Sequence, residues 1–222
     1  MLRSEAVTII KRGLGFRQTQ DASIIAALQE AQRDAESGHT LPAWIVNFGG
    51  SIEVEANHPF VVLPDDFLRM HDDFPLQYIR PAPNNTAQIF IPRLTYTDFR
   101  RIMTGSELGS LAIPTAADFP SGYILLSNRS LQLVPIPTND IILLVIYYAA
   151  QPVLDSDIEN NWLKYAPNYL IGLAGVKVAQ SLRDRGAMEK FNTMAQLGHK
   201  GLMGEIIEQE LVGRTLIMGR NN

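Results

Sequence analysis

The residue pattern of this chain changes twice along its length, and those changes limit the folds it can adopt. Before Leu41 and after Gln151 the apolar residues recur at helical spacing, whereas the chain between them is rich in Pro, Gly, Asn and β-branched residues. Short strands separated by turns are typical of antiparallel sheets. The sequence therefore predicts an α+β fold, in which N- and C-terminal helices form one bundle and an antiparallel β lobe, a small sandwich, is inserted between them. The predicted domains are 1–40 with 152–210 for the bundle, 41–151 for the lobe, and 211–222 for a C-terminal extension.

The helical parts carry start and stop signals. Asp21 is predicted to cap a helix that ends at Gly38. Pro167 suits the first position of a long helix, because proline lacks the backbone N–H that is unsatisfied there in any case. Another helix is predicted from about Ala187, and the short connection 183–186 makes these two helices antiparallel neighbours.

Gly172 and Gly175 lie three residues apart within the predicted long helix. A glycine inside a helix costs about 1 kcal/mol relative to alanine. Such glycines are useful where another backbone comes close. We therefore expect Gly172 and Gly175 to be positions of close helix packing, within one chain or between subunits.

The β lobe is predicted to consist of short strands joined by turns. Residues 127–130 are expected to form a tight turn, because Asn128 tolerates positive φ. A short helix capped by Thr97, with Phe99 and Ile102 on its apolar side, is predicted to interrupt the strands. The predicted strands are 43–48, 60–63, 67–70, 76–80, 88–91, 123–127, 130–134 and 141–148.

Composition excludes several classes of function. The chain has no cysteine, which rules out disulfides, thiolate nucleophiles and cysteine-based metal sites. Its formal net charge of -4 disfavours a protein that grips nucleic acid, since phosphate neutralisation needs clustered Lys and Arg. The N-terminus lacks the apolar core of a signal peptide, and the most apolar run, 141–150, is shorter than the roughly 20 residues of a membrane span. We expect a soluble, unexported protein with no membrane partner.

Two groups of residues are candidates for catalysis or metal binding. The cluster His71-Asp72-Asp73 follows Asp65 and Asp66, but consecutive strand residues point to opposite faces, so a polar loop is the favoured interpretation. Glu53 and Glu55 would share one strand face, as paired catalytic carboxylates do, yet a solvated face gives the same pattern more often. Neither group makes a convincing active site, and we expect no enzyme, metal or cofactor.

Several segments, in their order and spacing, resemble the head-to-tail adaptor (connector) proteins of tailed bacteriophages. The strand-turn-strand segment FPSGYILLSNRSLQLVPIP and the apolar strand LLVIYYAAQPVL are similar to the family's pattern. So are the asparagine-tryptophan-leucine segment NNWLKYAPNYLIGLA, the early helix LQEAQRDA, and the shorter pieces LPDDFL and PLQYI. The resemblance covers about two-thirds of the chain. The residues after Leu202 depart from the pattern, so the role of the C-terminus carries over least.

The resemblance implies a virion structural protein of the neck between capsid and tail, made in the host cytoplasm. Such proteins form a homo-oligomeric ring, dodecameric in these particles, that docks beneath the portal protein, extends the DNA channel and offers a platform for tail proteins. DNA would pass without sequence-specific binding and leave through the channel on ejection. Residues from Val212 onward have no obvious internal partner and are expected to be a loose tail that orders on the portal. The candidate portal contacts are Arg214, Leu216, Ile217, Met218 and Arg220.

Three alternatives remain open from the sequence. A tail-completion or tail-terminator ring protein would share the general pattern but lack affinity for the portal. A phage-encoded metal-dependent hydrolase or nuclease would use Glu53, Glu55 or the His71 cluster. A small DNA-binding regulator is disfavoured by the acidic balance and the missing recognition motif.

Overall fold

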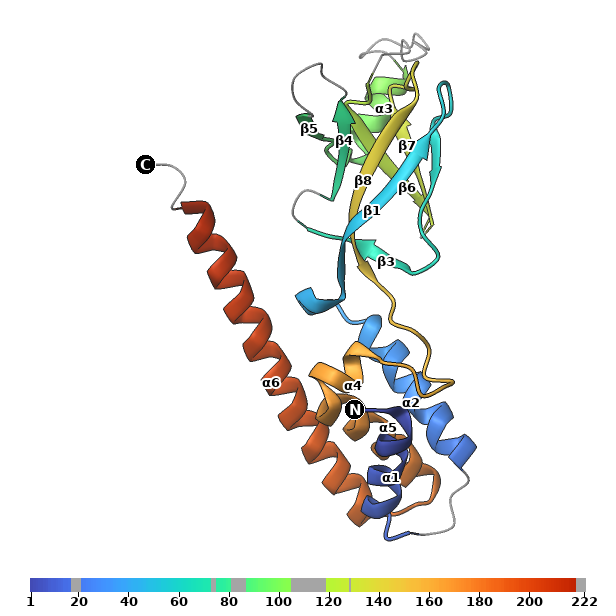
Figure 1. The fold of residues 1–222 in the computed structure, drawn as a ribbon, viewed down its shortest axis with the longest axis vertical. Coiled ribbons are helices and arrows are strands. Elements are labelled where there is room, and N and C mark those ends of the chain that lie inside the picture. Colours follow the sequence, from blue (N-terminus) through green and yellow to red (C-terminus); the bar gives the residue numbers. More distant parts are fainter. Residues whose placement is uncertain (17–20, 73–74, 81–86, 105–118, 128, 219–222) are drawn as a thin grey trace. The chain divides into compact units, whose positions relative to one another are not determined.

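The computed structural model describes residues 1–16, 21–72, 75–80, 87–104, 119–127 and 129–218. Residues Met1–Ile45 and Ala150–Asn222 form one compact unit, and Val46–Ala149 form a second (Figure 1). The first unit is helical and the second is built from antiparallel strands. The α+β class, with terminal helices and an inserted sheet, is confirmed.

The helical unit is built around α5, whose apolar residues are buried by the helices on either side. Its fully buried side chains include Ile10, Ile24, Leu28, Leu170 and Ile171. Pro167 occupies the first turn of α5, as predicted, and the Asn160 side chain caps α4 by accepting a hydrogen bond of 2.9 Å from the Trp162 N–H. The elements are α1 (Arg3–Gly13), α2 (Asp21–Glu36), the 3-10 turn η1 (Ala43–Ile45), α4 (Asn161–Tyr165), α5 (Pro167–Ser181) and α6 (Arg185–Met218).

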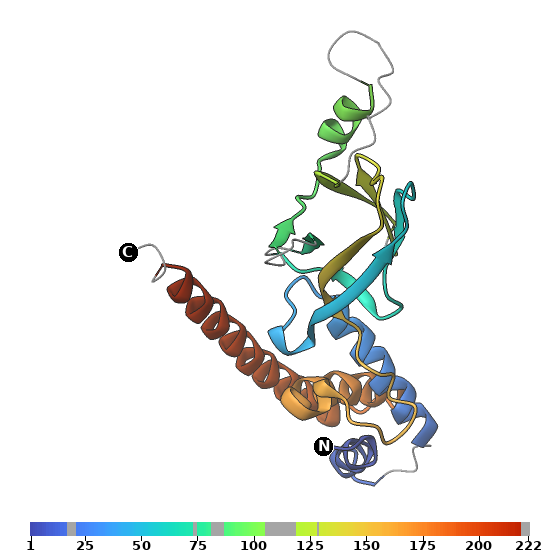
Figure 2. The same ribbon diagram turned by 45° about the horizontal axis from the view of Figure 1, so that its top comes forward.

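The β unit contains two antiparallel sheets (Figure 2). In the larger sheet the order is β1-β8-β4-β5, and β3 pairs with the end of β8 that β4 leaves free. In the smaller sheet the order is β2-β7-β6. The elements are β1 (Val46–Val54), β2 (Phe60–Val62), β3 (Phe67–Met70), β4 (Leu76–Arg80), β5 (Ala87–Phe90), α3 (Tyr96–Thr104), β6 (Gly122–Ser127), β7 (Ser130–Val134) and β8 (Ile141–Ala149).

Side chains from both sheets form one core in this unit. Alternate residues of β8, Leu143 and Val145, are fully buried, as the two-residue period of a strand requires. Leu131 and Leu133 of β7 are buried in the same cluster, together with Tyr123 of β6.

The structure corrects the first predicted strand and the predicted cap of the helix in the β unit. Residues 43–45 form a 3-10 turn closed by a hydrogen bond of 3.2 Å from the Ile45 N–H to the Pro42 carbonyl, and the strand runs instead over Val46–Val54. Thr97 lies inside α3, and the residue that caps this helix is Thr95. The Thr95 hydroxyl accepts a hydrogen bond of 3.1 Å from the Asp98 N–H and donates one of 2.7 Å to the Asp98 carboxylate. The Thr95 hydroxyl therefore satisfies one of the free N–H groups of the first turn, which explains why the helix begins at Tyr96.

The C-terminal segment also differs from the predicted loose tail. Helix α6 continues without a break through Val212 as far as Met218. Gly213 is helical, so a glycine in the interior of this helix does not end it. The turn predicted at 127–130 includes residue 128, which lies outside the described residues, but β6 and β7 pair directly through Ser127 and Ser130.

Candidate functional site

Three glycines allow α5 and α6 to pack closely. A Cβ added at Gly172 would lie 2.7 Å from Cα and 2.8 Å from Cβ of Ala195, and one added at Gly198 would lie 2.7 Å from Cα of Tyr169. A Cβ at Gly175 would overlap the ring of Phe191. The structure therefore places Gly172 and Gly175 against α6 within one chain. Gly198 completes the contact from the other helix.

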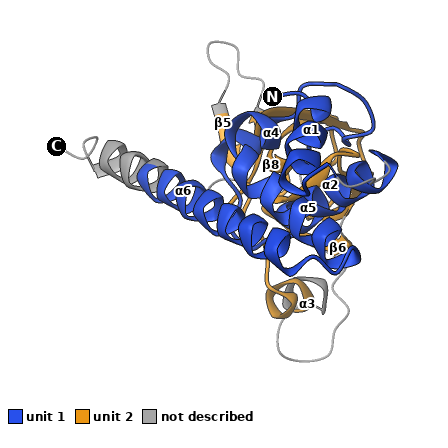
Figure 3. Cartoon of the chain, turned by 90° about the horizontal axis from the view of Figure 1, so that it is seen from below, with its two compact units in different colours: residues 1–45, 150–222 blue, residues 46–149 orange. Residues whose placement is uncertain are grey.

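Helix α6 is much longer than its main partner. At about 1.5 Å per residue, its 34 residues span roughly 51 Å, whereas the 15 residues of α5 span roughly 22 Å. Because the two helices are antiparallel and Gly198 already lies beside the beginning of α5, the rest of α6 continues past that helix (Figure 3). The backbone of Arg214, Leu216, Ile217 and Met218 lies in this distal part, and Arg220 lies outside the described residues.

Helix α6 exposes two large apolar side chains among polar ones. Leu197 is 66% exposed and Ile207 is 52% exposed, on the side opposite the buried Phe191 and Leu202. Between them, a Cβ added at Gly201 or at Gly204 would meet no atom within 4 Å. Sequence reasoning missed these two glycines, although their three-residue spacing matches that of Gly172 and Gly175.

A buried polar network fixes the point at which the chain returns from the β unit to the helical unit. One carboxylate oxygen of Glu36 accepts hydrogen bonds from Gln32 Nε2 at 2.9 Å, the Gln151 N–H at 3.0 Å and Trp162 Nε1 at 3.1 Å. The Asn160 amide donates to the Pro152 carbonyl at 2.8 Å and to Gln32 Oε1 at 3.2 Å. The network joins α2 to the segment before α4, and its buried side chains are held by hydrogen bonds as burial requires.

The aromatic residues of the helical unit pack against one another. The Trp44 and Trp162 rings meet edge to face with centroids 4.9 Å apart, and Trp162 lies 6.4 Å from Tyr169. Trp162 is 1% exposed, so its ring is part of the core. The spacing of Trp162, Tyr165 and Tyr169 along the sequence therefore reflects packing.

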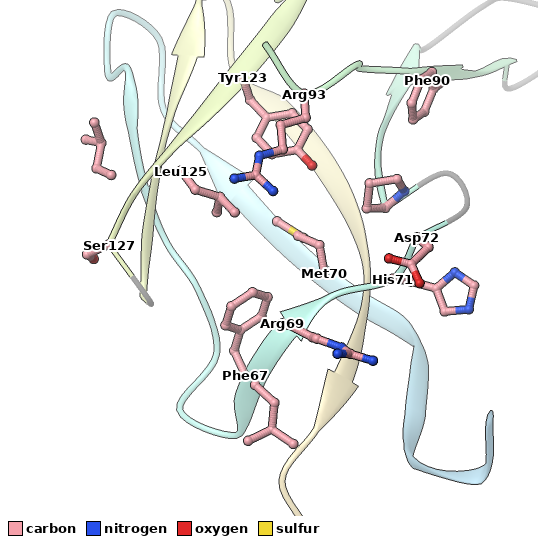
Figure 4. A pocket seen from close by; sticks show the side chains of 13 residues that line it. Phe67, Arg69, Met70, His71, Asp72, Phe90, Arg93, Tyr123, Leu125 and Ser127 are labelled. Carbon is pink, nitrogen blue, oxygen red and sulfur yellow. The ribbon is translucent and has the colours of Figure 1, made fainter. Parts of the chain in front are cut away.

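A cavity of about 620 Å³ opens on the β unit beside β3 and β6 (Figure 4). Its walls carry a mixture of apolar side chains and basic groups. Arg69 and Arg93 line it together with one acidic residue, Asp72, and Tyr123 borders it from β6. The lining residues are Phe67, Leu68, Arg69, Met70, His71, Asp72, Pro75, Phe90, Arg93, Tyr123, Leu125, Leu126 and Ser127.

The residues considered for metal or acid–base chemistry are separated in the structure. Asp65 pairs with Arg129 at 3.2 Å, Asp66 accepts from Tyr147, and the His71 ring stacks on Tyr148 with centroids 5.4 Å apart. Asp73 lies outside the described residues. Within the described ranges, no His, Asp and Glu side chains gather as a metal site would require.

Glu53 and Glu55 are both exposed to solvent, as expected for a solvated strand face. Glu53 is exposed on β1, where it pairs in register with Ile142 of β8. Glu55 follows the end of that strand and is also exposed. Of the helices that the structure describes, none has both the length and the hydropathy for a membrane crossing.

Tyr147 gives the β unit a measurable pH dependence. Its hydroxyl donates to Asp66 Oδ1 at 2.9 Å and accepts from Asn47 Nδ2 at 3.0 Å. Burial, reinforced by the hydrogen bond to Asp66, raises the pKa of Tyr147 from 10.0 to about 12. Because the folded state favours the neutral phenol, this stabilisation is fully present below pH 10 and is lost as the pH rises toward 12.

We therefore expect the free energy of unfolding to fall by about 1 to 2 kcal/mol between those pH values, allowing for solvent screening. Denaturant titrations at several alkaline pH values measure it. The Tyr147→Phe variant should lose a smaller amount over the same window. An equal fall in both proteins would show that Tyr147 makes no contribution.

Comparison with known proteins identifies one family. None of the curated proteins matches the sequence. The sequence model of the family described as SU10 adaptor protein matches residues 2–220, which is nearly the whole chain. This match confirms the resemblance to phage head-to-tail adaptors and extends it beyond Leu202, where the sequence pattern had departed from the family. The chain belongs to the SU10 adaptor protein family.

Proposed function

We propose that this protein is a structural, non-enzymatic subunit of the phage neck, which assembles into a homo-oligomeric ring beneath the portal protein. The ring extends the DNA channel and carries the tail proteins. Membership of the adaptor family over residues 2–220 supports this role. The observation that carries it is the distal part of α6, which continues past α5 and ends at Met218.

The distal part of α6 is the proposed docking element for the portal. A helix that is already formed loses less conformational entropy on binding than a loose tail, so the ordering cost of docking is smaller. Within this segment Arg214 brings positive charge, and Leu216, Ile217 and Met218 bring apolar residues. An apolar centre with a polar rim is the usual composition of a specific protein interface.

Removing residues 213–222 is expected to weaken binding to the cognate portal ring at least tenfold. The free energy of unfolding of the remaining chain should change little, because this segment lies beyond the α5–α6 contact. Binding is measured by surface plasmon resonance or by mass photometry of the mixture. Undiminished binding would remove α6 as the docking element.

A charge reversal separates the end of α6 from its beginning. Arg214→Glu should weaken portal binding, whereas Arg185→Glu, which makes the same change at the exposed first residue of α6, should not. Equal effects of the two variants would indicate a general charge effect, with no docking at the C-terminus.

DNA is proposed to pass through the ring without being held. The chain has 19 Lys and Arg against 23 Asp and Glu, and its formal net charge is -4. A ring of such subunits carries a negative field that repels phosphates, which favours sliding over binding.

A further inference from the structure

Two strand edges border the cavity of the β unit. Consecutive residues of β3 and the turn after it, Phe67 to Asp72, all line it, although neighbouring side chains on a strand point to opposite faces. The same holds for Leu125, Leu126 and Ser127 at the end of β6. Lining by consecutive residues means that the cavity runs along the edges of these strands and not over one face.

Neither edge has a strand beside it in the described residues. Strand β3 pairs with β8 alone, and β6 is the outer strand of its sheet. Within the described ranges, the edge of β6 is covered only at Tyr123, whose N–H donates to the Pro92 carbonyl at 3.0 Å and whose carbonyl accepts from the Leu94 N–H at 2.8 Å. An uncovered strand edge offers backbone donors and acceptors to an added strand.

The same cavity holds a buried hydroxyl that needs an acceptor, with an arginine beside it. Tyr123 is 0% exposed, and its hydroxyl has no hydrogen-bond partner among the described residues. Burial raises the pKa of Tyr123, against the opposing effect of the Arg93 guanidinium, so the hydroxyl remains a donor at neutral pH. Arg93 is bridged to Tyr123 through the backbone, and Figure 4 shows both side chains at the same end of the cavity.

These groups define the chemistry of the occupant. The buried Tyr123 hydroxyl requires an acceptor, and the exposed Arg93 guanidinium beside it attracts negative charge. A carboxylate supplies two oxygens that can meet both groups. Arg69 and Arg93 outnumber the single acid, Asp72, among the lining residues. The apolar lining by Phe67, Met70 and Leu125 suits alternate apolar side chains on either side of the carboxylate.

We propose that this cavity binds an extended, acidic segment of a partner protein, which adds as a strand along the edges of β3 and β6 and places one Asp or Glu carboxylate against Tyr123 and Arg93. The proposal goes beyond the ring-and-portal function and does not depend on it. It assigns the β unit a separate binding site for a peptide of defined chemistry.

Selection from a random nonapeptide library against the full-length protein tests the proposal without a known partner. The enriched peptides are expected to carry an Asp or Glu flanked by alternating apolar residues. Their affinity, measured by fluorescence anisotropy, should fall about tenfold when that acid is replaced by the matching amide. N-methylation of backbone N–H groups in the peptide should also weaken binding, because an added strand needs them.

Protein variants locate the site. Arg93→Gln and Tyr123→Phe should each weaken the selected peptides about tenfold, whereas Arg129→Gln, which changes an exposed arginine of the same unit outside the cavity, should not. Tyr123→Phe removes only a hydroxyl that has no partner in the described part of the chain, so the Tm of this variant should not fall. This separates loss of binding from loss of folding.

Four results would overturn the proposal: no enriched peptide, enriched peptides without an acid, affinity unaffected by both Arg93→Gln and Tyr123→Phe, or affinity unaffected by N-methylation. Portal binding of Arg93→Gln should equal that of the unchanged protein. A failure of the peptide site would therefore leave the ring-and-portal function standing, and a failure of portal binding would leave the peptide site standing.

Discussion

Replacing Gly172 with alanine is expected to lower the free energy of unfolding by about 3 kcal/mol. The added Cβ would lie 2.7 Å from Cα and 2.8 Å from Cβ of Ala195, closer than real Cβ atoms approach other heavy atoms. The obstacle is helix backbone and a Cβ fixed to it, so no flexible side chain can move aside. The two helices must separate, which opens the contact that α5 and α6 share. Urea denaturation followed by circular dichroism measures the change.

Gly201→Ala is the matched control on α6. A Cβ at Gly201 would meet no atom within 4 Å, so only helix propensity changes, and we expect the chain to become more stable by up to about 1 kcal/mol. The two variants make the same chemical change in helix interiors and should move stability in opposite directions. A Gly172→Ala protein at least as stable as the unchanged chain would contradict the packing described for α5 and α6.

Replacing Glu36 with methionine is expected to lower the free energy of unfolding by about 2 to 3 kcal/mol. Methionine has nearly the same length but provides no strong acceptor. The Gln151 N–H at 3.0 Å and Trp162 Nε1 at 3.1 Å would then lose the oxygen to which they donate. Trp162 is 1% exposed, so water cannot easily replace that oxygen. Chemical denaturation measures the loss.

Glu36→Gln separates the acceptor from the charge. Glutamine keeps one carbonyl oxygen, and in the structure a single oxygen of Glu36 receives all three donors. We expect this variant to lose about 1 kcal/mol, because only the charge assistance is removed. If methionine and glutamine reduce stability equally, the network does not act through the acceptor oxygen.

Local patterns predicted most of the β unit, and the first strand shows where such patterns fail. The apolar run 43–48 resembles a strand, but Pro42 accepts a hydrogen bond that turns the chain at Ile45. The strand then continues through Gly49 and Gly50, which usually interrupt one. A register shift between Asn47 and Gly50 accommodates them, and the Tyr147 ring occupies the space beside Gly50.

Some helix ends could be predicted from the sequence and others could not. Pro167 was sufficient to place the start of α5. The cap of α3 could have been found from Thr95 and Asp98, because a hydroxyl residue followed three positions later by an acid is a known signature. The extent of α6 could not be predicted from the sequence. Glycines at positions such as 201, 204 and 213 lower the helix propensity of this segment, which is nonetheless helical.

The features that depend on distant residues were invisible to sequence patterns. Glu36 receives donors from Gln151 and Trp162, which are more than a hundred residues away along the chain. The cavity in the β unit combines β3 of one sheet with β6 of the other, and no local spacing connects them. The functional hypothesis came from the resemblance to a family, because no motif in the sequence by itself indicates a binding partner.

The most direct test of the central claim is the mass of the purified protein, measured alone and after mixing with its cognate portal ring. Native mass spectrometry or mass photometry resolves the portal ring with and without added subunits. We predict a single discrete increase that equals a full set of subunits, with few partially filled portals. The proposed function would be contradicted if the portal mass stays unchanged when this protein is present in large excess over the portal ring.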